Sequence, residues 1–316
     1  MPAGDLFVLN RQAVRGEFAK NLEQASRAVE IGRLCLLTRS SGASERYGFG
    51  DSAPALQKFL GKRKKKQLGS AFVEIANDEW DSSIDLRVKD LRRDQTGTIR
   101  RRIGELATRA GYLPWRLVQQ ILLGTIAPVA YDGKVLISAT HSYGNSGTQT
   151  NALTATEVPT LNIATANAPT PAECAQMIGD VLGYMMTYKD DEGMPLHETA
   201  SQFLIVCHAK HIGSFNTAVK ANVLAGGANN PVAMQGVSID VVPGLMLTDD
   251  TKFRVFRTDS ENVKPFIFQT EVDPVVAVSP DDSDYVRQNK RYEAVCDYEC
   301  GIGIGEPLSA LECTMS

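Results

Sequence analysis

Two segments with the alternation of β-strands follow one another closely, and they limit the fold more than any other feature. The first reads SAFVEIA, and the second, SSIDLRVKD, alternates apolar Ile84, Leu86 and Val88 with charged residues. The turn-rich NDEWD lies between them, which predicts a long two-stranded hairpin. Because an isolated hairpin is marginally stable in water, we expect it to lie against a core of its own or against another chain.

Five cations stand side by side just before this hairpin, in the segment GKRKKKQLG. The chain of 316 residues has a net charge of -4, which excludes a generally basic protein that coats nucleic acid. Three interpretations stay open: a solvated surface, a contact with a polyanion, and a contact with an acidic neighbouring subunit. The basic run consists of Lys62, Arg63, Lys64, Lys65 and Lys66.

Helices and strands of mixed order fill the rest of the chain and predict the α+β class. Apolar residues at helical spacing predict a helix over residues 99–110, with Pro114 expected to begin a second helical segment. Thr170, Pro171 and Glu173 combine an N-cap, a first-turn proline and a capping-box glutamate, so another helix begins there. The strand QFLIVC, a helix and a closing set of strands follow.

Residues with the chemistry of enzymes are present, but their spacing does not support an enzyme. Cys207, His208 and His211 have the residue types of a zinc site without any Cys-x-x-Cys pair. His141 stands between two hydroxyl residues, without a nucleophile-elbow sequence. A hydrolase or metal-dependent enzyme using one of these groups remains the alternative, and we favour structural roles.

Composition and termini restrict the compartment and the redox state. No run of 18 apolar residues occurs, and no secretion signal is visible at the N-terminus. The six cysteines are scattered, so we expect reduced thiols that serve as core residues. Gly301, Gly303 and Gly305 alternate as in a dinucleotide loop, but the helix that such a loop needs does not follow.

Four segments, in this order, resemble the Mu-like major head subunit family of tailed-phage capsid proteins, which have the HK97 capsid fold. The resemblance extends over nearly the whole chain. Matching positions in the third and fourth segments include Tyr131, Asp132, Gly133 and His141, and then Lys264, Pro265 and Gln269. The segments are PALQKFLGKRKKKQLG, WDSSIDLRVKDLRRDQTG, LLGTIAPVAYDGKVLISATHSYG and FRVFRTDSENVKPFIFQTEVDPVVAV.

The resemblance implies an α+β, HK97-like fold in five parts. Residues 1–50 would be an N-terminal arm, and residues 51–92 an extended β-hairpin loop that lies over a neighbouring subunit. Residues 93–167 would form a peripheral domain with a long spine helix. Residues 168–258 would form an axial domain, and residues 259–316 would return as strands of the peripheral domain.

The resemblance also implies a function. The chain would be a major capsid protein of a tailed bacteriophage or prophage, without enzymatic activity or cofactor. It would self-assemble into hexamers and pentamers of an icosahedral shell that encloses double-stranded DNA. The expected location is the virion, after assembly in the host cytoplasm and without a membrane.

Its expected partners follow from the same resemblance. They are further copies of the chain, a separate scaffold protein during assembly, a portal protein at one vertex, and DNA that touches only the inner surface; a decoration protein is compatible with this scheme. Subunit contacts are expected from the extended loop, through Lys62, Arg63, Lys64, Lys65, Lys66 and Trp80. Asp281, Asp282 and Asp284 are the candidate acidic partners on the adjacent subunit.

Overall fold

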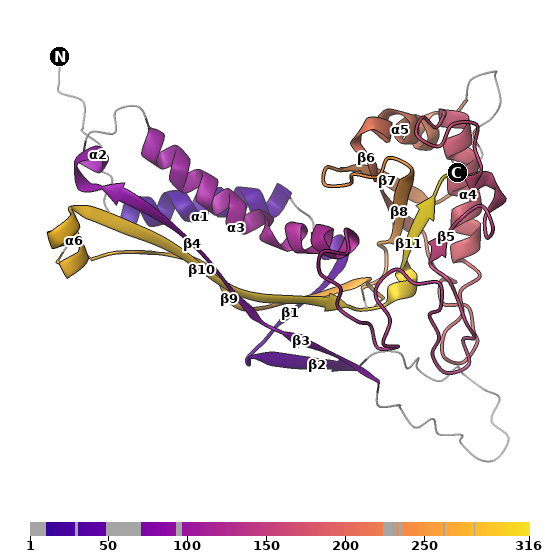
Figure 1. The fold of residues 1–316 in the computed structure, drawn as a ribbon, viewed down its shortest axis with the longest axis horizontal. Coiled ribbons are helices and arrows are strands. Elements are labelled where there is room, and N and C mark those ends of the chain that lie inside the picture. Colours follow the sequence, from indigo (N-terminus) through magenta and orange to yellow (C-terminus); the bar gives the residue numbers. More distant parts are fainter. Residues whose placement is uncertain are drawn as a thin grey trace.

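The protein has two lobes that lie side by side, one built on a long four-stranded sheet and one on a five-stranded sheet (Figure 1). The mixture of helices and sheets confirms the α+β class. The computed structural model describes residues 11–28, 31–48, 71–92, 97–223, 230, 232, 236–261, 263–280 and 282–316.

The four-stranded sheet has the order β1-β9-β10-β4. β1 runs parallel to β9, whereas β9 with β10 and β10 with β4 are antiparallel. Two helices cover one face of this sheet (Figure 1). The elements of this lobe are α1 (Arg11–Ala28), the short helix η1 (Ile31–Arg33), β1 (Cys35–Arg39), β4 (Asp78–Arg87), α2 (Val88–Arg92), α3 (Thr98–Leu122), β9 (Phe266–Val278), α6 (Asp284–Asn289) and β10 (Arg291–Ile304).

The predicted helical stripe of α3 makes the core of this lobe together with one face of α1. Phe18 of α1 and Ile103 of α3 are almost fully buried against Val276 of β9 and Cys296 of β10. Complete burial of a side chain of this size contributes ~1.5–3 kcal/mol. Residues 11–28 and 31–39, expected to belong to an arm, form α1, η1 and β1, which are part of the folded lobe.

The helix α3 does not stop at Pro114. It continues from Thr98 to Leu122 with Pro114 buried inside it, so the expectation of two helical segments is wrong. A proline within a helix removes one backbone hydrogen bond and costs ~3 kcal/mol. Burial of Leu117, Val118 and Ile121 in the core between the lobes offsets this cost.

The five-stranded sheet has the order β5-β11-β8-β6-β7 and carries α4 and α5 on its outer side (Figure 1). Thr170 caps α4 with the predicted capping box, since its hydroxyl accepts from the Glu173 N–H and Glu173 bonds back to Thr170. The elements are β5 (Ala152–Leu153), η2 (Pro159–Leu161), α4 (Pro171–Met185), β6 (Gln202–His208), η3 (Ala209–His211), α5 (Ile212–Lys220), β7 (Ser238–Gly244), β8 (Lys252–Arg257), η4 (Pro307–Ser309) and β11 (Ala310–Thr314).

The last strand of the chain crosses from one lobe to the other. β11 pairs with β8 and β5, so the expectation that all of residues 259–316 return to the peripheral sheet is wrong for this strand. Leu311 and Cys313 of β11 are fully buried beneath α4, with Met177 and Phe253. Burial of these two side chains, which share one face of β11, stabilises the strand in the second lobe.

The hairpin predicted for residues 70–90 does not form, because its two strands pair with other strands. β3 (Phe72–Ala76) pairs with β2 (Ser44–Gly48), whereas β4 pairs along its whole length with β10. The cause is burial: β4 turns Leu86 toward the helices, while β3 turns Val73 and Ile75 onto the opposite face of the same sheet.

Glycines on β10 allow the β2–β3 pair to lie directly on the sheet. A Cβ atom at Gly301 would stand 2.2 Å from the carbonyl oxygen of Ala76, and one at Gly303 would stand 2.6 Å from the side chain of Ile75. Gln269, fully buried, donates to the Ile75 oxygen at 3.1 Å and holds β3 in place. The alternating glycines therefore serve close packing of two backbones.

A single methyl group at this crossing should destabilise the fold. We expect Gly301→Ala to lower the free energy of unfolding by ~2–3 kcal/mol, because β3 must move away from the sheet. Gly183→Ala is the matched control: nothing lies within 4 Å of its Cβ position in α4, and alanine favours helices by up to ~1 kcal/mol. Urea unfolding of both variants checks this, and equal stabilities would contradict the close-packing argument.

Candidate functional site

The basic run Lys62–Lys66 lies outside the described residues, and so does Asp281. The structure describes the two strands, β2 and β3, between which the segment with the run lies in the sequence. β2 and β3 form an antiparallel ladder that begins at Ser44 opposite Ala76 and ends at Gly48 opposite Phe72. Residues 49–70 connect the two strands at this far end of the ladder.

The other predicted contact residues occupy two different places. Trp80 is half-buried on β4 and packs against the core that joins the lobes. Asp282 and Asp284 are exposed, and Asp284 stands in the first turn of α6, where a helix favours a carboxylate. The structure thus packs Trp80 partly against the core and leaves the two aspartates at the far tip of the sheet.

The loop around His141 is held by a buried hydrogen bond between two side chains. The His141 Nδ1 donates to Asp132 at 2.6 Å, and both side chains are almost fully buried. Burial alone would raise the pKa of Asp132, but the hydrogen bonds from His141 and from the Lys134 N–H outweigh it and lower the pKa. The other ring nitrogen faces the oxygen of Leu136 at 3.3 Å.

This geometry leaves His141 without a nucleophile to activate. Both ring nitrogens lie against oxygen acceptors, whereas a catalytic histidine bonds to the hydroxyl or thiol it deprotonates. The neighbouring Thr140 hydroxyl lies 3.5 Å from that of Ser138 instead. The pair is therefore an anchor of the loop that connects the lobes, and the alternative of an enzyme using His141 is not supported.

A buried carboxyl group that the sequence did not indicate completes this anchor. Glu306 follows β10 and accepts from the Tyr131 hydroxyl, at 3.0 Å and 3.1 Å to its two oxygens, across 175 residues of sequence. Burial raises the pKa of Glu306 to about 7, although the bonds from the Leu308 N–H and Tyr131 lower it in part. No local sequence pattern marks such a distant pair.

The candidate zinc residues are each used in local packing. Cys207 is fully buried in the core beneath α4. His208 accepts from the Lys210 N–H at 3.2 Å, and His211 donates to the Asp250 oxygen at 2.9 Å. Within the described residues no three metal-ligating side chains come together, so the alternative of a metal-dependent enzyme has no site there.

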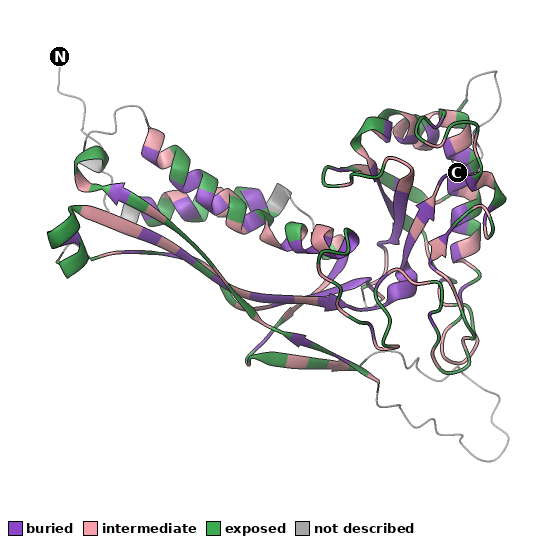
Figure 2. Cartoon of the chain, in the orientation of Figure 1, coloured by how far each residue is buried: buried purple, intermediate pink, exposed green. Residues whose placement is uncertain are grey.

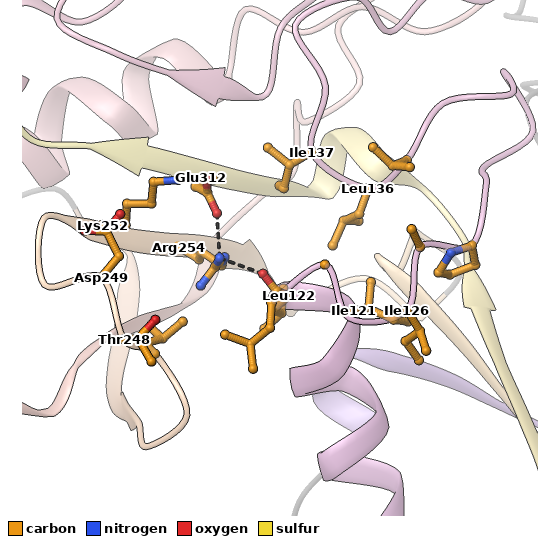
Figure 3. A pocket seen from close by; sticks show the side chains of 16 residues that line it. Ile121, Leu122, Ile126, Leu136, Ile137, Thr248, Asp249, Lys252, Arg254 and Glu312 are labelled. Carbon is orange, nitrogen blue, oxygen red and sulfur yellow. Dashed lines mark hydrogen bonds and ion pairs between the residues drawn. The ribbon is translucent and has the colours of Figure 1, made fainter.

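The core between the lobes contains a pocket of about 350 Å³ beside the end of α3 (Figure 3). Arg254 of β8 lies in its wall, where the Nη2 donates to the Leu122 oxygen at 2.7 Å and to Glu312 at 2.6 Å. Its Nε and Nη1 are buried, and neither has a hydrogen-bond partner among the described residues. Because the Leu122 oxygen belongs to the last turn of α3, Arg254 ties the helix end to the second sheet.

Taken together, the described side chains offer anchors and packing surfaces rather than a reaction centre. The six cysteines are buried thiols without disulfide bonds, as expected. No helix in the described ranges is both long and apolar enough to cross a membrane.

Comparison with known proteins finds similarity to phage head proteins. The family model described as "Mu-like prophage major head subunit gpT" matches residues 9–172. Over 169 residues the chain is 22% identical to the Mu-like prophage FluMu major head subunit of Haemophilus influenzae. The aligned residues cover 52% of this chain and 55% of that protein. The chain thus spans about half the length of this relative.

Solved structures share the fold over more of the chain. The procapsid of bacteriophage JBD30 aligns with a TM-score of 0.52 at 16% identity, over 96% of this chain and 75% of that one. The JBD30 capsid decorated with minor capsid protein trimers aligns with a TM-score of 0.53 at 17% identity, over 70% of this chain and 92% of that one. The HK97-like fold expected from the sequence is confirmed by these neighbours.

The buried Glu306 should make stability depend on pH. Its pKa is raised from 4.5 to about 7 on folding, so its contribution is fully present below pH 4.5 and is lost as pH rises through 7. We expect the wild-type chain to lose up to ~3 kcal/mol over this range relative to Glu306→Gln, which cannot ionise. Unfolding across pH 4.5–8 measures the difference.

The exposed Glu198 supplies the matched control for this comparison. Glu198→Gln should keep the wild-type pH profile, since the same chemical change occurs there in water. Identical profiles for wild type and Glu306→Gln would show that Glu306 does not carry the effect.

Proposed function

Since the chain belongs to the Mu-like prophage major head subunit family, we propose that it is the major capsid protein of a tailed bacteriophage or prophage. Copies of the chain would associate into the hexamers and pentamers of an icosahedral shell around double-stranded DNA. The observation that carries this proposal is the two-lobed fold, shared with a phage procapsid protein over 96% of the chain.

The physical basis of this function is association and not catalysis. A ring forms when one patch of each subunit binds a different patch of the next subunit. The ring closes when the rotation between neighbouring subunits adds up to a full turn. Each contact can be modest, because many simultaneous contacts add through multivalency. A chain that uses its buried polar groups as anchors suits this role, since each subunit must keep its shape in every ring.

We propose that the two lobes are the expected domains, with adjusted boundaries. The four-stranded sheet with α3 as the spine helix would be the peripheral domain. Residues 168–258 together with β11 would be the axial domain, and residues 51–92 would contain the extended loop. The ladder of β2 and β3 supports a loop whose base lies at residues 44–48 and 72–76.

The remaining partners are proposed by the same reasoning. A separate scaffold protein would guide assembly, and a portal protein would occupy one vertex. The capsid of JBD30 is described as decorated with minor capsid protein trimers, which supports a decoration protein here. The chain would act in the virion after assembly in the host cytoplasm, and packaged DNA would meet the inner surface.

The extended loop would supply subunit contacts through the basic run Lys62–Lys66. The exposed Asp282 and Asp284, with Asp281, form one candidate acceptor on an adjacent copy. Trp80 would act indirectly, since its ring supports β4 from within.

Assembly of the purified chain tests the proposed function. We expect rings, tubes or closed shells in negative-stain images, and a sedimentation profile that shifts to large species as concentration rises. The measurement is made with the full chain, alone and together with its scaffold protein. A chain that stays a small monomer at every concentration, with and without scaffold, would overturn the proposal.

A further inference from the structure

A pocket of about 350 Å³ between the lobes has a wall that consists mostly of apolar side chains (Figure 3). One part of the lining comes from the end of α3 and the loop after it, and includes Ile121, Ile126 and Val135. The other part comes from the second lobe, through β8, β11 and the turn before β8. Pockets of this size that lie where domains meet are a common place for small-molecule ligands.

Large apolar side chains are exposed in the lining of this pocket and beside it (Figure 2). Leu123 and Val135 belong to the lining, and both are exposed. Leu245 is 78% exposed and, with the exposed Met246, directly precedes the lining residue Leu247. Contact between water and this apolar surface is unfavourable, and a ligand with an aliphatic part would remove it. The lining therefore favours an apolar ligand.

The polar end of the pocket has more hydrogen-bond donors than acceptors. Arg254 is 5% exposed, and its Nη2 donates to the Leu122 oxygen and to Glu312. The N–H groups on its Nε and Nη1 have no acceptor among the described residues. Lys252, which is partly exposed, donates to the other oxygen of Glu312 at 3.0 Å. Two cations thus share one carboxylate at this end of the pocket.

Asp249, the other carboxylate of the lining, does not supply the missing acceptor. It is exposed, and its Oδ1 accepts from the Thr251 N–H at 3.0 Å and from the Thr251 hydroxyl at 2.7 Å. No hydrogen bond joins it to Arg254 in the described part of the chain. A buried donor without an acceptor is destabilising, so an oxygen atom of a ligand would be favoured beside the guanidinium group.

We propose that this pocket binds a small molecule with an aliphatic tail and a carboxylate head, the chemistry of a medium-chain fatty acid. The tail would lie against the apolar lining, and the head would accept from Arg254 and Lys252. The guanidinium group is held through its Nη2, so rotation about this atom would turn the Nη1 N–H groups toward the head. Because the lining comes from both lobes, the bound molecule would stabilise their relative placement.

Calorimetric titration of the full chain with decanoate tests this binding. Hexanoate has the same head and a tail shorter by four methylene groups. Each buried methylene group changes affinity about fourfold, so hexanoate should bind about two-hundredfold more weakly. Decylammonium has a tail of nearly the same length but a head that only donates, and it should bind about tenfold more weakly than decanoate or worse. All three probes are used below the concentrations at which they aggregate.

A larger side chain in the lining should exclude the tail. We expect Val135→Trp to abolish decanoate binding, because the added ring would occupy the pocket. Val129→Trp is the matched control, since Val129 is exposed on the same loop but lies outside the lining. Decanoate binding should be unchanged in this control.

Removal of one cation tests the contact with the head. Lys252→Met keeps an aliphatic side chain and should weaken decanoate binding about tenfold, as expected for one charge-assisted hydrogen bond. Lys210→Met is the matched control, since Lys210 pairs with Asp250 and neither residue lines the pocket. The unfolding temperature shows whether each variant folds. If Val135→Trp does not, the two lysine variants decide the question.

Three results would overturn the inference. They are a wild-type chain that does not bind decanoate, decylammonium that binds as tightly as decanoate, and decanoate binding that a folded Val135→Trp leaves unchanged. If decanoate does not bind and Val135→Trp prevents assembly while Val129→Trp does not, a second copy of the chain occupies the pocket and the ligand inference fails. The titration does not depend on the proposed function, because a chain that never assembles can still bind decanoate.

Discussion

The long strand β10 is the element on which the rest of the structure depends, because both of its edges and both of its faces are used. Its 14 residues pair with β9 on one side and β4 on the other. Ala294 and Cys296 lie under the helices, and Tyr298 and Cys300 under the core between the lobes. The opposite face admits β3 only because Gly301 and Gly303 lack side chains that would block it.

A shared core and a few buried polar groups join the lobes. Leu204 and Phe256 of the second sheet pack with Phe266 of β9 and with the end of α3. Arg254 of the second sheet bonds to the last turn of α3, so separation of the lobes would break the bond between its guanidinium group and the Leu122 oxygen. Such buried bonds favour one relative placement over many, since a broken one leaves its partner unpaired.

Several residues by which the chain resembles the family form buried hydrogen bonds that hold the fold together. Asp132 and His141 pair with each other, Lys264 donates to the Arg33 oxygen at 2.9 Å, and Gln269 holds β3 to the sheet. Each of these side chains bonds to a buried backbone or side-chain group that water would otherwise solvate. This need explains why particular polar residues stand at positions without a reactive role. They maintain the single shape that the proposed role in a shell would require.

The local patterns of the sequence determined several helices and strands: the capping box at Thr170, the helical stripe that includes Ile103, and the strand QFLIVC all form as predicted. Only the tertiary structure decided which strands pair, that α3 passes through Pro114, and that Glu306 meets Tyr131. The reason is physical. Caps and periodicity depend on residues a few positions apart, whereas strand pairing, burial and the opposed carboxylates of β4 and β10 depend on segments that meet only when the chain has folded.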